Sequence, residues 1–133
     1  MTVFADAFFY IALLSKRDEF HVPVLKWVAA YKGRVVTSEW ILLEVGNALA
    51  GTLGRRCLRQ QIHRLRSEPS TKLVEVSSAD FEQALALYDE RPDKKWSLTD
   101  CLSFLIMKRE RISEALTRDH HFGQAGFVPL FAE

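Results

Sequence analysis

Short apolar runs that favour β-strands alternate with helix-patterned segments along this chain of 133 residues. Strands joined through helices run parallel, and helices must then cover both faces of the sheet. The alternation therefore predicts an α/β fold, a three-layer α/β/α sandwich around a central, mainly parallel sheet of four to five strands. Pro129 lacks the backbone N–H that a central strand needs, which places the last strand at an edge. The expected strands are residues 2–5, 34–37, 71–76, 114–117 and 127–131.

Capping residues and helix breakers set the expected helix boundaries. Ser38, Ser78 and Ser97 suit N-caps, whereas Gly33 and Gly51 suit helix ends. No repeat, low-complexity tract or interdomain linker interrupts the order, so residues 1–133 are expected to form a single domain. The expected helices are residues 7–14, 18–31, 38–50, 54–67, 78–88 and 97–111.

The composition is that of an ordinary globular protein, with 48% hydrophobic and 26% charged residues. A formal net charge of +1 lacks the bulk signature of a nucleic-acid binder, although one face can still be positive. Cys57 and Cys101 form no C-x-x-C pair, which argues against a disulfide framework and a zinc–thiolate site. The apolar run 8–14 is too short to span a bilayer, so we expect a cytoplasmic protein without membrane insertion.

Three acidic residues stand at expected strand ends or helix starts. Asp6 and Asp119 follow expected strands, and Asp100 comes three residues after Ser97. Each has a simple structural explanation as a helix cap or first-turn acid, since Ser-x-x-Asp resembles a capping box. Each also has a functional explanation, because the carboxyl ends of parallel strands form the ligand-binding rim of such folds.

Glu44 lies inside the apolar helical stretch ILLEVGNALA. A carboxylate there loses hydration unless it is paired, bound to a metal or at the edge of the apolar stripe, where it reaches water. If the four acids meet at one rim, their charges raise one another's pKa values, and a divalent cation would keep them ionised. Carboxylate ligands without His or Cys favour Mg²⁺ or Mn²⁺, and such cations typically serve phosphate chemistry.

Four segments in this order resemble those of a known family. They are FADAFFYIAL around Asp6, ILLEVGNALA around Glu44, WSLTDCLSF around Asp100 and ALTRDHHFGQAGF around Asp119. Through them nearly the whole chain resembles the PIN-domain nucleases, and most closely the VapC-type toxins of bacterial toxin–antitoxin pairs. The resemblance implies a Mg²⁺- or Mn²⁺-dependent endoribonuclease that hydrolyses RNA and leaves a 5′-phosphate and a 3′-hydroxyl. It makes the four acids one catalytic, metal-binding quartet, with Asp6 and Asp100 as direct ligands, completed by Glu44 and Asp119.

The resemblance also implies supporting residues and partners. Asn47 and Thr117 would be polar supports of the quartet, whereas Ala7 stands where family members often carry Thr or Ser. A protein of this type would form a homodimer through helices near its third and fourth. It would also bind a cognate antitoxin whose segment covers or enters the acidic site. The RNA that is cut stays open between tRNA, rRNA and mRNA.

The expected helix at 54–67 carries five arginines and no acid before Glu68. One of its faces is either a solvated surface or a track for RNA phosphates. Two lysines just before the Asp100 helix could meet RNA as well. The candidate RNA-binding residues are Arg55, Arg59, Arg66, Lys94 and Lys95.

Adjacent side chains on a helix point in different directions, so His120 and His121 are not expected to share a metal. A surface or packing role is expected for both.

Two other functions are compatible with an α/β fold of this size. One is a catalytically silent PIN-like module that binds RNA or protein, and the intact quartet argues against it. The other is a phosphotransfer or phosphatase domain. A dehalogenase-type phosphatase needs a second Asp two residues after Asp6, where this chain has Phe8.

Overall fold

A parallel sheet forms the middle layer of the protein in a computed structural model that describes residues 1–132. Its strands lie in the order β3-β2-β1-β4-β5, and every neighbouring pair is parallel. The predicted α/β sandwich is therefore confirmed, and β5 lies at an edge as Pro129 requires. The strands are β1 (Thr2–Ala5), β2 (Arg34–Ser38), β3 (Thr71–Val74), β4 (Glu114–Leu116) and β5 (Val128–Pro129).

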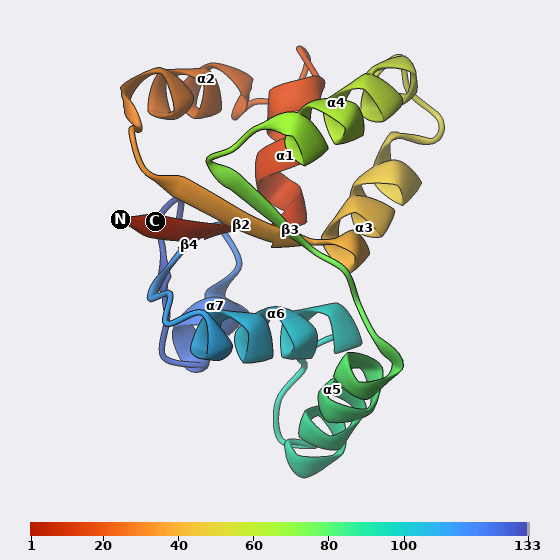
Figure 1. Ribbon diagram of the computed structural model, residues 1–133, viewed down its shortest axis with the longest axis vertical. Helices are drawn as coiled ribbons and strands as arrows, with labels where there is room; N and C mark the ends of the chain where they lie inside the picture. The colour runs from red at the N-terminus through yellow and green to blue at the C-terminus, as the bar shows by residue number, and fades with distance from the viewer. Residues whose placement is uncertain (133) are drawn as a thin grey trace.

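Helices cover both faces of this sheet. Figure 1 shows α1 to α4 on one face and α5 to α7 on the other. The connections from β1 to β3 thus run over one face, and the long crossover from β3 to β4 runs over the opposite face. The helices are α1 (Ala7–Leu14), α2 (His21–Ala30), α3 (Glu39–Leu49), α4 (Arg55–Ser67), α5 (Ser78–Glu90), α6 (Leu98–Arg109) and α7 (His120–Gln124).

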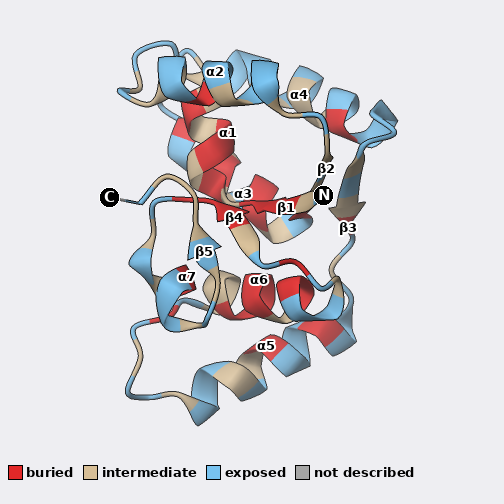
Figure 2. Cartoon of the chain, turned by 90° about the vertical axis from the view of Figure 1, so that its left-hand side faces the viewer, coloured by how far each residue is buried: buried red, intermediate tan, exposed pale blue. Residues whose placement is uncertain are grey.

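The core fixes β1, which Asp6 directly follows, and α6, whose first turn contains Asp100. Val3, Phe4 and Ala5 of β1 are buried in the centre of the sheet. Helix α6 is buried over most of its length because it lies between the sheet and α5, and both views show this arrangement (Figures 1 and 2). A helix that is apolar around most of its circumference packs on several sides, which fixes the position of its first turn.

Several element boundaries differ from the sequence prediction. Helix α2 starts at His21, because Asp18 accepts the backbone N–H of Phe20 and closes a turn ahead of the helix. The N-cap of α5 is Ser77 and not Ser78, because Ser77 forms a capping box with Asp80 three residues on.

The strands near the edges are shorter than predicted. Strand β3 ends at Val74, opposite the end of β2, and the N–H of Val76 turns to the side chain of Glu39. Strand β5 keeps only Val128 and Pro129.

The short helix α7 was not predicted at all. Among residues 1–132, no helix has the length and apolar character to cross a membrane.

Candidate active site

The strand order reverses between β1 and β4, next to the central strand. Strands β2 and β3 lie on one side of β1, and β4 and β5 lie on the other. The segments that leave β1 and β4 therefore diverge, and in open α/β sheets such a point is where ligands bind. Asp6 directly follows β1, and Thr117 and Asp119 follow β4.

Asp6 occupies the N-cap position of α1, yet its side chain makes no capping hydrogen bond. The hydroxyl of Thr117 instead donates to Asp6 Oδ2 at 2.7 Å. Burial raises the pKa of Asp6 to about 6 against the hydrogen bonds from Thr117 and Ala7, and the charges of Asp100 and Glu44 raise it further. Asp6 is thus the N-cap residue of α1 by position, but its carboxylate is held by Thr117 and not by a capping hydrogen bond.

Glu44 projects from α3, whose Ile41 and Val45 are buried against the core. Its side chain is half-buried, and burial raises the pKa of its carboxyl group. A hydrogen bond from Thr99 lowers this pKa, and the charges of Asp100 and Asp119 raise it. Glu44 on one helical layer is therefore electrostatically coupled to the start of α6 on the other.

Asp100 forms the capping box that the SLTD motif predicts, and its side chain also lies near the other acids. Its N–H donates to Ser97 Oγ at 3.0 Å and its Oδ2 accepts the N–H of Ser97 at 3.1 Å, so the capping box is present. Its side chain is only 14% exposed. Burial raises the pKa of Asp100 against the hydrogen bond from Ser97, and the charge of Asp119 raises it further. A first-turn acid of α6 is thus also part of the acidic cluster.

Asp119 is the N-cap of α7, where its Oδ1 accepts the N–H of His121 at 2.9 Å. Its own N–H donates to the hydroxyl of Thr117 at 3.0 Å. Thr117 therefore links the acid after β1 to the acid after β4. Its hydroxyl donates to the carboxylate of Asp6 and accepts the backbone N–H of Asp119. This bridging hydroxyl, just after β4, provides a side-chain hydrogen bond to Asp6 that the methyl side chain of Ala7 cannot make.

The four acids form one electrostatic group of oxygen donors. The charges of Asp100 and Glu44 act on Asp6, and the charge of Asp119 acts on both Glu44 and Asp100. Each of these interactions disfavours ionisation, whereas a divalent cation among the carboxylates would reverse that effect. The donor set of carboxylates on a rigid rim therefore fits a divalent cation.

The structure places both histidines beside the acidic cluster, which the sequence did not predict. His121 Nδ1 lies 3.2 Å from Asp100 Oδ2 and 3.3 Å from Asp119 Oδ1. His120 Nδ1 lies 3.7 Å from Asp119 Oδ1, so both rings reach the same carboxylate. Both residues belong to the first turn of α7, directly after Asp119, so both side chains stay near that acid. The sequence offered no sign of this helix, and hence none of the position of His121.

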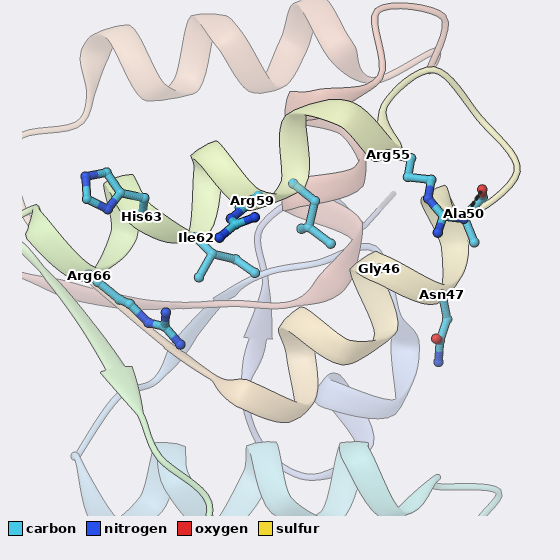
Figure 3. Close-up of a pocket in the computed structure, with 9 residues that line it drawn as sticks. Gly46, Asn47, Ala50, Arg55, Arg59, Ile62, His63 and Arg66 are labelled. Atoms are coloured by element: carbon cyan, nitrogen blue, oxygen red, sulfur yellow. Dashed lines mark hydrogen bonds between the residues drawn. The ribbon is translucent and has the colours of Figure 1, made fainter.

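The predicted basic residues lie in both helical layers. Figure 3 shows a groove between α3 and α4 with Arg55, Arg59 and Arg66 along it, and Asn47 at its α3 wall. Asn47 is exposed there, one turn beyond Glu44. Lys94 and Lys95 lie in the loop between α5 and α6, shortly before Asp100.

Comparisons with known proteins agree with this geometry. The PIN domain family matches residues 3–128. The "23S rRNA-specific endonuclease VapC20" of Mycobacterium tuberculosis is 31% identical over 137 aligned positions, which cover 98% of this chain and 99% of the relative. The crystal structure of that protein, described as a sarcin–ricin loop cleaving toxin, matches with a TM-score of 0.85 and 26% identity, over 96% of this chain and 98% of the other. A toxin–antitoxin complex from Klebsiella pneumoniae, with a TM-score of 0.68 and 19% identity over 98% and 99% of the two chains, shares the fold.

Proposed function

The chain belongs to the PIN-domain family, and we propose that it is a divalent-metal-dependent endoribonuclease, the toxin of a toxin–antitoxin pair. The observation that supports this most strongly is the convergence of four carboxylates at the strand-order reversal, in a chain that matches an endonuclease over almost its full length. The activity would reside in one PIN-like domain, residues 1–133, and act on RNA in the cytoplasm.

Asp6, Glu44, Asp100 and Asp119 would hold Mg²⁺ or Mn²⁺. When bound, the cation polarises a phosphoryl oxygen, promotes attack by water and neutralises charge that develops in the transition state. Thr117 fixes the Asp6 carboxylate by donating to Oδ2, and the N–H of Ser97 fixes Asp100 in the same way. These contacts hold both carboxylates in place, so the geometry of the site is set before the ligand arrives.

The substrate would be ribosomal RNA. The relative with 31% identity is specific for 23S rRNA, and its crystal structure is described as that of a sarcin–ricin loop cleaving toxin. Primer extension on ribosomes incubated with the purified protein tests this assignment. We expect one dominant cut within the sarcin–ricin loop, and cuts confined to tRNA or mRNA would contradict the substrate.

The α3–α4 groove would guide the RNA backbone to the site. Arg59 and Arg66 line it, whereas Arg56 of the same helix does not. Replacing both Arg59 and Arg66 with Gln should weaken binding of single-stranded RNA and reduce the slope of log K against log salt by about 1.4, since each lost phosphate contact contributes about 0.7. Arg56→Gln is the matched control. A double variant with the same salt slope as the unsubstituted protein would exclude this path.

A homodimer would form through an apolar patch on α3 and α5. Leu43 is 63% exposed and Phe81 is 43% exposed. Phe81 packs edge-on against Trp40 of α3 at 5.6 Å between ring centroids, so the two helices present one surface. We place this surface on the third and fifth helices, where Leu43 and Phe81 are exposed, and not on the third and fourth helices that the family resemblance implied.

The dimer predicts an effect of Leu43→Glu on mass in solution. A buried, unpaired carboxylate is costly, so the variant should be monomeric where the unsubstituted protein is dimeric. Light scattering after size exclusion measures this. Leu53→Glu, at a residue that is 76% exposed in the α3–α4 loop, serves as the control and should remain dimeric. Equal masses for both variants would place the interface elsewhere.

A further inference from the structure

The imidazole of His121 is held between two carboxylates of the candidate metal site. Its side chain is 19% exposed, whereas that of neighbouring His120 is 76% exposed. The backbone N–H of His121 donates to Asp119, and its carbonyl accepts the N–H of Ala125 at 3.1 Å. The backbone of His121 is therefore held through both its N–H and its C=O, while its ring reaches toward α6.

His121 Nδ1 is within hydrogen-bonding distance of Asp100 Oδ2, and it lies almost as close to a second carboxylate. The Nδ1 atom lies 3.2 Å from Asp100 Oδ2 and 3.3 Å from Asp119 Oδ1. One N–H points well at one acceptor, yet here one nitrogen is almost equally far from two carboxylates on different elements. Asp100 Oδ2 also accepts the N–H of Ser97, and a carboxylate oxygen has a second lone pair for a further partner.

The separations of these donor atoms suit a shared cation. Ligands of an octahedral ion with bonds of about 2.1 Å lie about 3.0 Å apart along each edge. Ligands of a tetrahedral ion with similar bonds lie about 3.4 Å apart. The separations of Nδ1 from Asp100 Oδ2 and from Asp119 Oδ1 both fall between these values.

We propose that His121 Nδ1 is a nitrogen ligand of the metal site, together with Asp100 and Asp119. This inference rests on the proposed function and adds to it the class of cation that the site selects. Imidazole binds transition-metal cations and contributes little to Mg²⁺, which keeps oxygen ligands and water. The site therefore prefers a transition-metal cation such as Mn²⁺ over Mg²⁺. A ligand atom of His120 also lies within 4.8 Å of those of Asp119 and His121, but its side chain is 76% exposed, and we leave it outside the ligand set.

Electron spin-echo spectroscopy of Mn²⁺ bound to the purified protein tests this assignment, because a coordinated histidine nitrogen modulates the echo. We expect ¹⁴N modulation in the unsubstituted protein and in His120→Gln, and none in His121→Gln. Labelling histidine with ¹⁵N should replace the ¹⁴N pattern in the unsubstituted protein, which makes the result independent of how any variant folds. Absence of nitrogen modulation, or its persistence in His121→Gln, would overturn the proposal.

Metal titrations by calorimetry separate this inference from the proposed function. His121→Gln should weaken Mn²⁺ binding by about tenfold or more and change Mg²⁺ binding by less than about threefold. Mn²⁺ that binds without nitrogen modulation and is lost in Asp100→Asn would leave the acidic site intact and refute the role of His121 alone. A protein that binds neither cation would refute the metal site and the proposed function with it.

Discussion

Replacing Asp6 with Asn is expected to stabilise the metal-free protein while removing its response to divalent cations. Burial raises the pKa of Asp6 to about 6 from an ordinary value near 4. At pH 7.5 the folded state must therefore hold a carboxylate that its surroundings disfavour. Asn has no charge and can still accept the hydrogen bond of Thr117. The variant should gain about 3 kcal/mol in its free energy of unfolding, measured with urea in EDTA.

The stability gained by Asp6→Asn should depend on pH. Between pH 4 and 6 the folded protein holds a proton on Asp6 that the unfolded chain releases, so stability falls as the pH rises through this window. The gain from Asp6→Asn should thus be complete above about pH 7 and vanish near pH 4. Asp89→Asn, at an exposed acid of α5, should show no such gain. Adding Mn²⁺ at pH 7.5 should stabilise the unsubstituted protein and not Asp6→Asn. A variant that is less stable at every pH would show that the Asp6 charge is compensated within the fold.

Asp100→Asn is expected to lower kcat/KM for RNA by roughly a thousandfold or more while the fold remains. The Asn side chain can still accept the N–H of Ser97, so the first turn of α6 keeps that half of its capping box. What it loses is the negative charge that a cation needs. Cleavage of a labelled RNA, with circular dichroism to check the fold, measures both consequences.

Ser97→Ala is the matched control for Asp100→Asn. It removes the hydroxyl that accepts the N–H of Asp100 and leaves the carboxylate in place. Loss of this cap should cost about 1 kcal/mol of stability and leave kcat/KM within about threefold. If Ser97→Ala lost as much activity as Asp100→Asn, helix capping would explain Asp100 and the catalytic assignment would fail.

Local sequence patterns predicted which site residues lie at a strand end or in the first turn of a helix. Asp6 follows an apolar run, so its place at a strand end could be predicted from the sequence alone. The Ser-x-x-Asp spacing likewise predicted the capping box of α6, and the structure confirms it. Thr117, two residues before Asp119, was identified through the family resemblance, and the structure places its hydroxyl against Asp6.

The parts that the sequence could not supply depend on contacts between elements. Helix α7 has only five residues, too few for a periodic pattern, and it starts only because Asp119 caps it. The position of His121 follows from that helix and from the packing of α7 beside α6. The α3–α4 groove and the apolar patch of Leu43 and Phe81 also join residues from separate helices. Periodicity shows which residues share a face, and tertiary packing decides which faces meet.

Cleavage of total RNA by the purified protein tests the central claim most directly. The protein is incubated with RNA in Mn²⁺, in Mg²⁺ and in EDTA, beside Glu44→Gln purified in the same way. Glu44 is half-buried in the middle of α3, between the caps Ser38 and Ala50, so Glu44→Gln should remove one ligand without unfolding a helix end. Our account predicts discrete fragments with a 5′-phosphate and a 3′-hydroxyl in the presence of a cation, and none in EDTA or with Glu44→Gln. The same fragments in EDTA, or from Glu44→Gln at an equal rate, would contradict a nuclease that depends on a cation held by these four acids.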